Sequence, residues 1–206
     1  MNAGVNRACE RELRAVLRAW TKIQDELAVQ YVKVGEVPWW YTEAASLSTF
    51  SGAIWRTNGD VLHEYGTTKF RRDKQGARRR INGRCDIYFR TGSTYYVGEA
   101  KRCLVSMSAS RPEAKIQKKL VAATTASMEL PSPVRKGYRR AAILFVTFYV
   151  RRTERIDLNE LIKRWNEAFE MMPGVSIAWT FPQVARKFKY GPNFYPGTAV
   201  VIEVQD

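Results

Sequence analysis

The sequence predicts a mixed α/β fold, in which helices flank a central mixed sheet and a C-terminal helix–strand–strand extension follows. Two observations lead to this prediction. Helical and strand-like hydrophobic patterns follow one another along the chain, and its 206 residues are enough to bury a core as one domain. We divide this single domain into an N-terminal helical extension (1–38), a core (42–150) and a C-terminal extension (151–206).

The first two elements are expected to be helices. In the segment Arg7–Tyr31 apolar side chains recur at the spacing of one helical face, and Gly35 and Pro38 end the pattern. A second helix is expected over Thr42–Arg56, with its first residue as the N-cap and Asn58-Gly59 as the stop signal. These two helices are expected to lie before the first strand of the core.

The later elements alternate between strands and helices. Pro112 suits the first turn of a helix, and the unbroken apolar run within 138–150 suits a buried strand. The capping-box pattern at 157–160 opens another helix. We therefore expect strands at 61–70, 83–89, 95–101 and 138–150, helices at 112–128 and 157–172, and final strands near 175–181 and 198–204.

Two neighbouring strands carry polar side chains on otherwise apolar runs. Gly83–Phe89 and Tyr95–Lys101 are separated by a short turn-forming segment, which predicts a hairpin. Because side chains alternate along a strand, Glu99 and Lys101 are expected on one face of the sheet. Gly98 and Ala100 are expected on the other face. The hairpin would bring Asp86 beside them from the adjacent strand.

Two carboxylates and an ammonium at one sheet surface predict a site for a divalent cation. Carboxylates on adjacent strands repel each other, so such a pair favours a bound cation or a shared proton. Oxygen ligands without His or Cys suit Mg²⁺ or Mn²⁺ rather than zinc. The alternative is that Glu99 and Lys101 form a solvated pair and Asp86 ends a turn, but the apolar context of both strands favours the cation site.

At these residues the chain resembles the PD-(D/E)xK nuclease superfamily, whose members have the restriction-endonuclease-like fold. Asp86 matches the first acid of the motif, Glu99 the second acid and Lys101 the lysine, while Cys85 stands in place of the proline. The order of helix, three strands, helix and strand expected over 42–150 also matches that superfamily, so the resemblance covers about half of the chain.

The resemblance implies roles for these residues. Asp86 and Glu99, with the backbone carbonyl of Ala100, would coordinate one Mg²⁺ or Mn²⁺ ion. Lys101 would orient the attacking water and help to deprotonate it.

The resemblance also implies a further acid near the metal. Glu43 is the best match, because it opens the helix before the first core strand, although it also suits a helix N-terminus for electrostatic reasons alone. Glu64 is a second candidate. Some exonuclease-like members carry Gln-x-x-x-Tyr on the helix after the lysine, and here Gln117 is present but Val121 replaces the tyrosine.

The charge of the chain predicts a polyanionic partner. Lys and Arg number 34 and Asp and Glu 20, which gives a net charge of +14, and this favours nucleic acid. A charged run is usually a solvated loop, but the density of Arg and the presence of Gly76 favour a mobile phosphate-binding element between the first two core strands. The candidate contacts there and on the following helix are Lys69, Arg71, Arg72, Lys74, Arg78, Arg79, Arg80, Arg84, Lys115, Lys118 and Lys119.

Cysteine usage and hydropathy predict a cytoplasmic protein. The cysteines Cys9, Cys85 and Cys103 form no metal-binding pattern, and no apolar export segment is visible near the first residue. The longest apolar run, at 141–150, is too short to span a bilayer, so no membrane association is expected. The one histidine, His63, is expected to have a structural or substrate-contacting role.

Together these patterns predict a metal-dependent nuclease, either endonuclease or exonuclease, that hydrolyses phosphodiester bonds. The resemblance favours DNA over RNA as the partner. The sequence leaves the oligomeric state open, and a homodimer is one arrangement that would permit two cuts. The alternative is a non-catalytic basic protein on the same fold that binds nucleic acid or another partner, with Asp86 and Glu99 as structural ion-pair residues.

Overall fold

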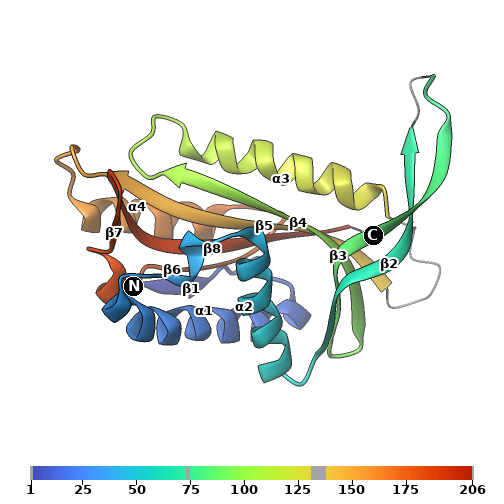
Figure 1. The fold of residues 1–206 in the computed structure, drawn as a ribbon, viewed down its shortest axis with the longest axis horizontal. Helices are drawn as coiled ribbons and strands as arrows, with labels where there is room; N and C mark the ends of the chain where they lie inside the picture. The colour runs from blue at the N-terminus through green and yellow to red at the C-terminus, as the bar shows by residue number, and fades with distance from the viewer. Residues whose placement is uncertain (1, 73–74, 131–137, 206) are drawn as a thin grey trace.

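An eight-stranded mixed sheet organises the described part of the chain in this computed structural model (Figure 1). The structure describes residues 2–72, 75–130 and 138–205, with the backbone alone for Arg72 and Arg78. Its α-helices are α1 (Arg11–Tyr31), α2 (Glu43–Arg56), α3 (Pro112–Met128) and α4 (Leu158–Met171). Its strands are β1 (Ala3–Val5), β2 (Asp60–Arg72), β3 (Arg78–Thr91), β4 (Thr94–Ser106), β5 (Tyr138–Arg151), β6 (Ser176–Thr180), β7 (Lys189–Tyr190) and β8 (Asn193–Gln205).

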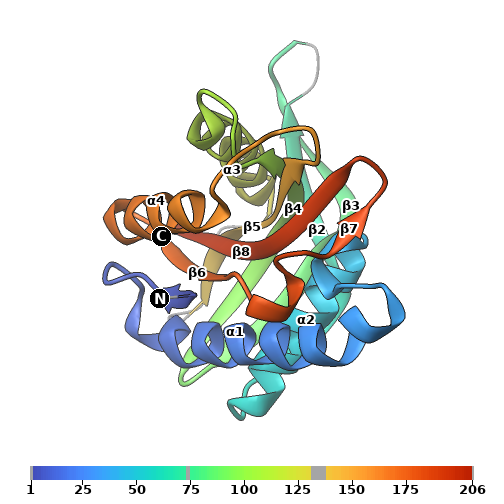
Figure 2. The same cartoon turned by 90° about the vertical axis from the view of Figure 1, so that its left-hand side faces the viewer.

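The sheet combines a meander with one parallel pair. Its strand order is β1-β6-β8-β5-β4-β3-β2, and β7 pairs with β8 beside this path. β4 and β5 are parallel because α3 connects them as a crossover, whereas the other pairs are antiparallel. The mixed α/β class predicted from the sequence is confirmed, and helices flank the sheet on both faces (Figure 2).

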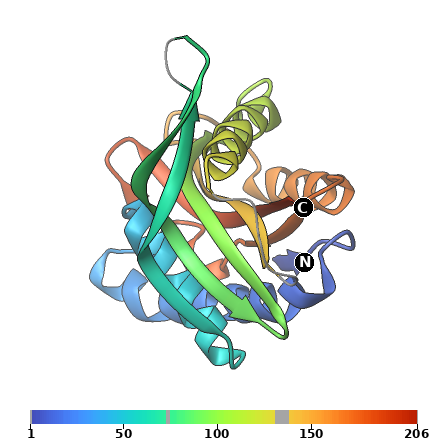
Figure 3. The same cartoon turned by 90° about the vertical axis from the view of Figure 1, so that its right-hand side faces the viewer.

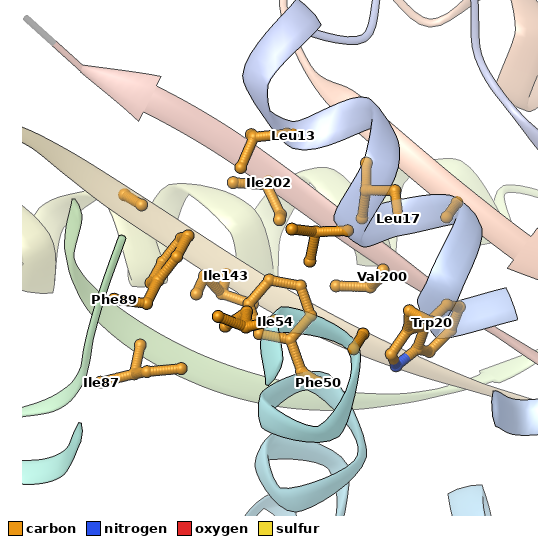
Figure 4. Close-up of a cluster of buried hydrophobic side chains, with 14 of the residues drawn as sticks. Leu13, Leu17, Trp20, Phe50, Ile54, Ile87, Phe89, Ile143, Val200 and Ile202 are labelled. Carbon is orange, nitrogen blue, oxygen red and sulfur yellow. The ribbon is translucent and has the colours of Figure 1, made fainter. Parts of the chain in front are cut away.

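Each face of the sheet has its own apolar core. α1 and α2 cover one face, where large side chains of both helices pack on β3, β5 and β8 (Figure 4). α3 and α4 cover the other face, where Ile116, Leu120, Trp165 and Phe169 pack on β5 and β8. Full burial of each such side chain stabilises the fold by about 1.5–3 kcal/mol.

The element order expected between residues 42 and 150 is confirmed as α2, β2, β3, β4, α3 and β5. The first helix begins at Arg11 rather than Arg7, because residues 3–5 pair with β6 and the chain then turns at residues 7–8 before the helix starts. The side chain of Asn6 continues that pairing: it donates to the carbonyl of Val175 at 2.9 Å and accepts from the N–H of Ile177 at 2.9 Å. β8 begins at Asn193, five residues before the expected strand.

The basic segment between the first two core strands forms a longer hairpin than expected. β2 and β3 pair from Asp60 with Arg90 to Arg72 with Arg78, so both strands continue beyond the ends expected at residues 70 and 83. Arg71, Arg79, Arg80 and Arg84 remain exposed on this two-stranded ribbon, and for this reason their charge does not prevent the strand pairing. The hairpin projects beyond the body of the sheet (Figure 3).

The remaining expectations concern the cysteines and membrane spans. Cys9, Cys85 and Cys103 are all buried and free of disulfides. Within the described ranges, no helix combines the length and the apolar character that crossing a bilayer requires.

Candidate active site

Asp86 lies at the point where β3 and β4 part. The ladder between these strands runs from Thr91 with Thr94 to Ile87 with Gly98 and ends there. The carboxylate of Asp86 then accepts a hydrogen bond from the backbone N–H of Ala100 at 2.7 Å. A side-chain oxygen thus takes the place of a ladder carbonyl, which anchors the carboxylate at the divergence of the two strands.

Glu99 is a buried carboxylate on the neighbouring strand. Burial raises its pKa above the usual range for glutamate, and the charge of Asp86 shifts the pKa in the same direction. The preceding Gly98 allows β4 to pack closely here, because a Cβ at that position would lie 3.0 Å from Ile87 Cγ2 and 3.2 Å from the carbonyl of Ala141. Glu99 and Asp86 thus lie close enough for the charge of one carboxylate to affect the pKa of the other.

Lys101 completes the group that the sequence predicted. Its ammonium donates to the carbonyl of Ala100 at 2.6 Å and lies 3.9 Å from Oδ2 of Asp86. On the same strand, Ala100 packs into the core under α1 and α2, so Glu99 and Lys101 face the other side of the sheet. The alternation expected from the sequence is confirmed.

Lys69 is a member of the site that sequence reasoning placed elsewhere. It was expected among the exposed nucleic-acid contacts, but its ammonium lies 2.7 Å from Oε1 of Glu99, and the two side chains are only 13% and 5% exposed. Its stem crosses Gly83, where a Cβ would lie 2.9 Å from Lys69 Cγ. A glycine within a run of arginines was the signal in the sequence that one long side chain passes over the strand.

Glu43 approaches the same group from the first turn of α2. Thr42 caps this helix by accepting a hydrogen bond from the N–H of Ala45 at 3.3 Å. Burial raises the pKa of Glu43; the charge of Lys101 lowers it, and the charge of Asp86 raises it. The nearby backbone N–H of Arg102 also lowers this pKa. Glu43 is thus within electrostatic reach of the predicted motif.

Glu64, the other candidate acid, is not brought into the buried group. Its side chain is 65% exposed and lies 3.8 Å from Arg84 Nη1 on the projecting hairpin. Its φ of +51° belongs to the left-handed region, which is unusual for a residue other than glycine within a strand. The structure therefore places Glu64 in solvent rather than beside Glu99.

The donors expected to hold a metal each contact a lysine in this structure. Lys69 contacts Glu99, and Lys101 contacts both Asp86 and the carbonyl of Ala100. Among the described residues, no three or more His, Cys, Asp or Glu side chains are grouped to hold an ion. Two carboxylates and one carbonyl nevertheless fit Mg²⁺, which is commonly bound by one or two carboxylates and retains several waters.

Most of the other predicted contacts lie on the surface. Arg71, Arg79, Arg80 and Arg84 are exposed on the hairpin, and Arg71 also forms an ion pair with Glu129 at 2.9 Å. On α3 the exposed residues are Lys115, Lys118 and Lys119, the first of which lines an open hollow with Tyr149 and Arg151. Lys74 lies outside the described residues, and for Arg72 and Arg78 only the backbone is described.

His63 is directed toward the helical layer. Its Nε2 lies 2.5 Å from Oγ of Ser51 on α2, which makes it a contact between β2 and that helix.

No family model and no curated protein matches the chain. Among solved structures, the chain is similar to one described as "Crystal structure of SSO0001", with 14% identity over 76% of this chain and 75% of that chain. The TM-score of this match is 0.22.

Proposed function

We propose that this chain is a divalent-metal-dependent nuclease that hydrolyses phosphodiester bonds in DNA. The observation that supports the proposal best is the convergence of Asp86, Glu99 and Lys101 at the end of the β3–β4 ladder. Two acids whose charges interact, beside a lysine on the same sheet face, suit the binding of a cation and of the phosphate that it polarises. The net charge of +14 supports a polyanionic substrate.

Each residue of the site has a task that its contacts favour. Asp86 and Glu99, with the carbonyl of Ala100, would hold the ion. When bound, Mg²⁺ or Mn²⁺ would supply a Lewis acid that stabilises charge on the scissile phosphate and activates a water. Lys101, whose ammonium already donates to the carbonyl of Ala100, would donate to the attacking water or a phosphate oxygen and hold it in place.

Glu43 would support this group from α2. Its half-buried carboxylate lies within electrostatic reach of both Asp86 and Lys101. It would act through a water, either by orienting that water toward the phosphate or by receiving its proton.

One observation favours the alternative of a basic nucleic-acid-binding protein without catalysis. The carboxylates of Asp86 and Glu99 already contact the ammonium groups of Lys101 and Lys69. A site of this kind is balanced in charge without an ion. The two candidates therefore differ in whether a divalent ion can displace the lysines.

A cleavage assay tests the proposal. Purified protein is incubated with end-labelled single-stranded DNA, duplex DNA and RNA in Mg²⁺, Mn²⁺ or EDTA. We expect cleavage of DNA only with a divalent ion, and a loss of about a hundredfold or more for Asp86→Asn and for Lys101→Met. The first removes a charged ligand of the ion, and the second removes the ammonium that would hold the water or the phosphate oxygen.

Asp60→Asn is the matched control, because Asp60 is an exposed carboxylate on the same hairpin that pairs with Arg90 at 2.6 Å. It should cleave as the wild type does. Cleavage by a folded Lys101→Met protein at the wild-type rate would reject the proposal. Binding without cleavage in either metal by the wild type would favour the non-catalytic alternative.

A further inference from the structure

Four tyrosines from four neighbouring strands form a stacked row that none of the chemistry above uses. Tyr65 of β2 stacks on Tyr88 of β3 with ring centroids 5.3 Å apart, and Tyr88 stacks on Tyr95 of β4 at 6.2 Å. Tyr95 stacks on Tyr138 of β5 at 4.8 Å with an interplanar angle of 12°. We call these four residues the tyrosine row.

The tyrosine row lies on the face of the sheet that carries the two acids. On β4, Tyr96 packs into the core under α1 and α2, so Tyr95 and Glu99 face the opposite side. On β3, Phe89 packs into the same core, so Tyr88 and Asp86 also face the opposite side. The row and the candidate active site therefore share one surface.

An irregular backbone brings Tyr65 into the row. His63 contacts Ser51 on α2, and regular alternation along β2 would direct Tyr65 toward α2 as well. The left-handed φ of +51° at Glu64 interrupts that alternation, and the ring of Tyr65 instead lies against Tyr88. Strained backbone of this kind persists where the surrounding structure requires it, often at binding sites.

The row is also close to the acids and accessible. Tyr88 follows Asp86 by two positions along β3, a rise of about 7 Å, so one nucleotide could span from the acids to the row. Tyr65, at the outer end, is 45% exposed. Arg84 precedes Asp86 by two residues and is 70% exposed, which places a cation for phosphate beside the acids.

We propose that the exposed end of the tyrosine row, at Tyr65, is a stacking platform for unpaired bases, so that the substrate is a single-stranded nucleic acid or a single-stranded end. This inference depends on the proposed function for the role of the acids, but not for the binding itself. Bases within a duplex have both faces covered by their neighbours, whereas an unpaired base offers a free face to an aromatic side chain. The exposed arginines of the hairpin match the charge of the backbone of such a strand.

Binding without cleavage tests the inference. Fluorescence anisotropy measures the affinity for a labelled thymidine oligonucleotide and for a duplex of the same length, in EDTA and at one salt concentration. The variants are Tyr65→Leu, Tyr65→Phe and the control Tyr31→Leu, because Tyr31 is 43% exposed at the end of α1.

We expect the wild type to prefer the single strand, and Tyr65→Leu to bind it about tenfold more weakly with an unchanged salt dependence, because only stacking is lost. Tyr65→Phe keeps the ring and should bind as the wild type does, as should Tyr31→Leu. The affinity of Tyr65→Leu for the duplex should not change, which also shows that the variant is folded.

Two results would overturn the inference: a preference of the wild type for the duplex, or equal single-strand affinities of Tyr65→Leu and Tyr65→Phe. The proposed function fails separately. A tyrosine-dependent preference for single strands in a protein that cleaves nothing would retain the platform and reject the nuclease. Cleavage of duplex DNA that is indifferent to Tyr65→Leu would retain the nuclease and reject the platform.

Discussion

The neighbours of Glu99 shift its pKa in opposite directions. Burial and the charge of Asp86 raise its pKa, whereas the ammonium of Lys69 at 2.7 Å lowers it. A buried carboxylate of this kind needs a cation, and either a lysine or a divalent ion can serve. At the scale of residues, Lys69 is therefore the group that an incoming ion must displace from Glu99.

Lys69→Met should destabilise the protein by about 3 kcal/mol in EDTA at pH 7, because it leaves the charge of Glu99 buried without a partner. Urea unfolding measures the change. Arg71→Met is the control on the same strand; its ion pair with Glu129 is largely exposed, and its loss should change stability by less than about 0.5 kcal/mol.

The same Lys69→Met variant should recover stability with Mn²⁺ and at lower pH. The ion takes the place of the lost ammonium. Without Lys69 the pKa of Glu99 rises further, so the folded state takes up a proton more readily than the unfolded state, and the deficit shrinks as the pH falls toward the ordinary pKa of glutamate. A deficit that is independent of both Mn²⁺ and pH would contradict the placement of Lys69 on Glu99.

Glu64→Gly tests the second candidate acid. Glycine adopts the φ of +51° without strain, so we expect stability to stay the same or to rise by up to about 1 kcal/mol. The cleavage rate should equal that of the wild type, because the Glu64 side chain is exposed and apart from Glu99. A tenfold loss of cleavage in the folded variant would instead make Glu64 a functional ligand.

At the scale of elements, the close packing of β4 between β3 and β5 positions the site. Gly98→Ala should destabilise the protein by about 1–3 kcal/mol, because the added methyl group meets Ile87 and the backbone carbonyl of Ala141. Gly66→Ala on β2 is the matched control, since a Cβ there meets nothing within 4 Å. Equal melting temperatures of the two variants would show that the packing at Gly98 does not constrain the strand.

The elements whose signals are local were predicted well. α3 has the bounds expected from Pro112 and its apolar spacing, and β5 ends one residue beyond the expected strand. The hairpin was predicted too short, because the arginines beyond Phe70 resemble a solvated loop until pairing with β3 is known. β1 was missed because three residues carry too little pattern, and its pairing with β6 depends on contacts far along the chain.

The candidate active site likewise contains residues that local sequence patterns predict and one that depends on contacts distant in the sequence. Asp86, Glu99 and Lys101 belong to one hairpin, so alternation along two adjacent strands was enough to bring them together. The position of Lys69 was missed, because the irregular backbone at Glu64 changes the face on which the later side chains of β2 lie, and Gly83 was the one sequence signal of the side chain that crosses it.

The tyrosine row also could not be predicted from local sequence patterns. Tyr138 joins it only because the crossover through α3 sets β5 beside β4, in a register that pairs Tyr95 with Tyr138.

At the scale of the whole molecule, the charge of +14 should make binding of nucleic acid strongly dependent on salt. Replacing Arg79, Arg80 and Arg84 together with Gln should lower the slope of log K against log salt by up to about 2–3, because each phosphate contact contributes about 0.7–0.9. Replacing the exposed Arg11, Arg18 and Lys22 of α1 with Gln removes the same charge on another element. Equal slopes for the two triple variants would exclude the hairpin as the main phosphate contact.

The central claim is that two carboxylates of neighbouring strands can hold a divalent ion. Titration with Mn²⁺, followed by the electron paramagnetic resonance signal of the free ion, tests it most directly in the wild type, Asp86→Asn, Glu99→Gln and Asp60→Asn. The account predicts one ion per chain in the wild type and in Asp60→Asn, and at least tenfold weaker binding in the other two variants. Absence of saturable binding in the wild type, or equal affinity in all four proteins, would contradict it.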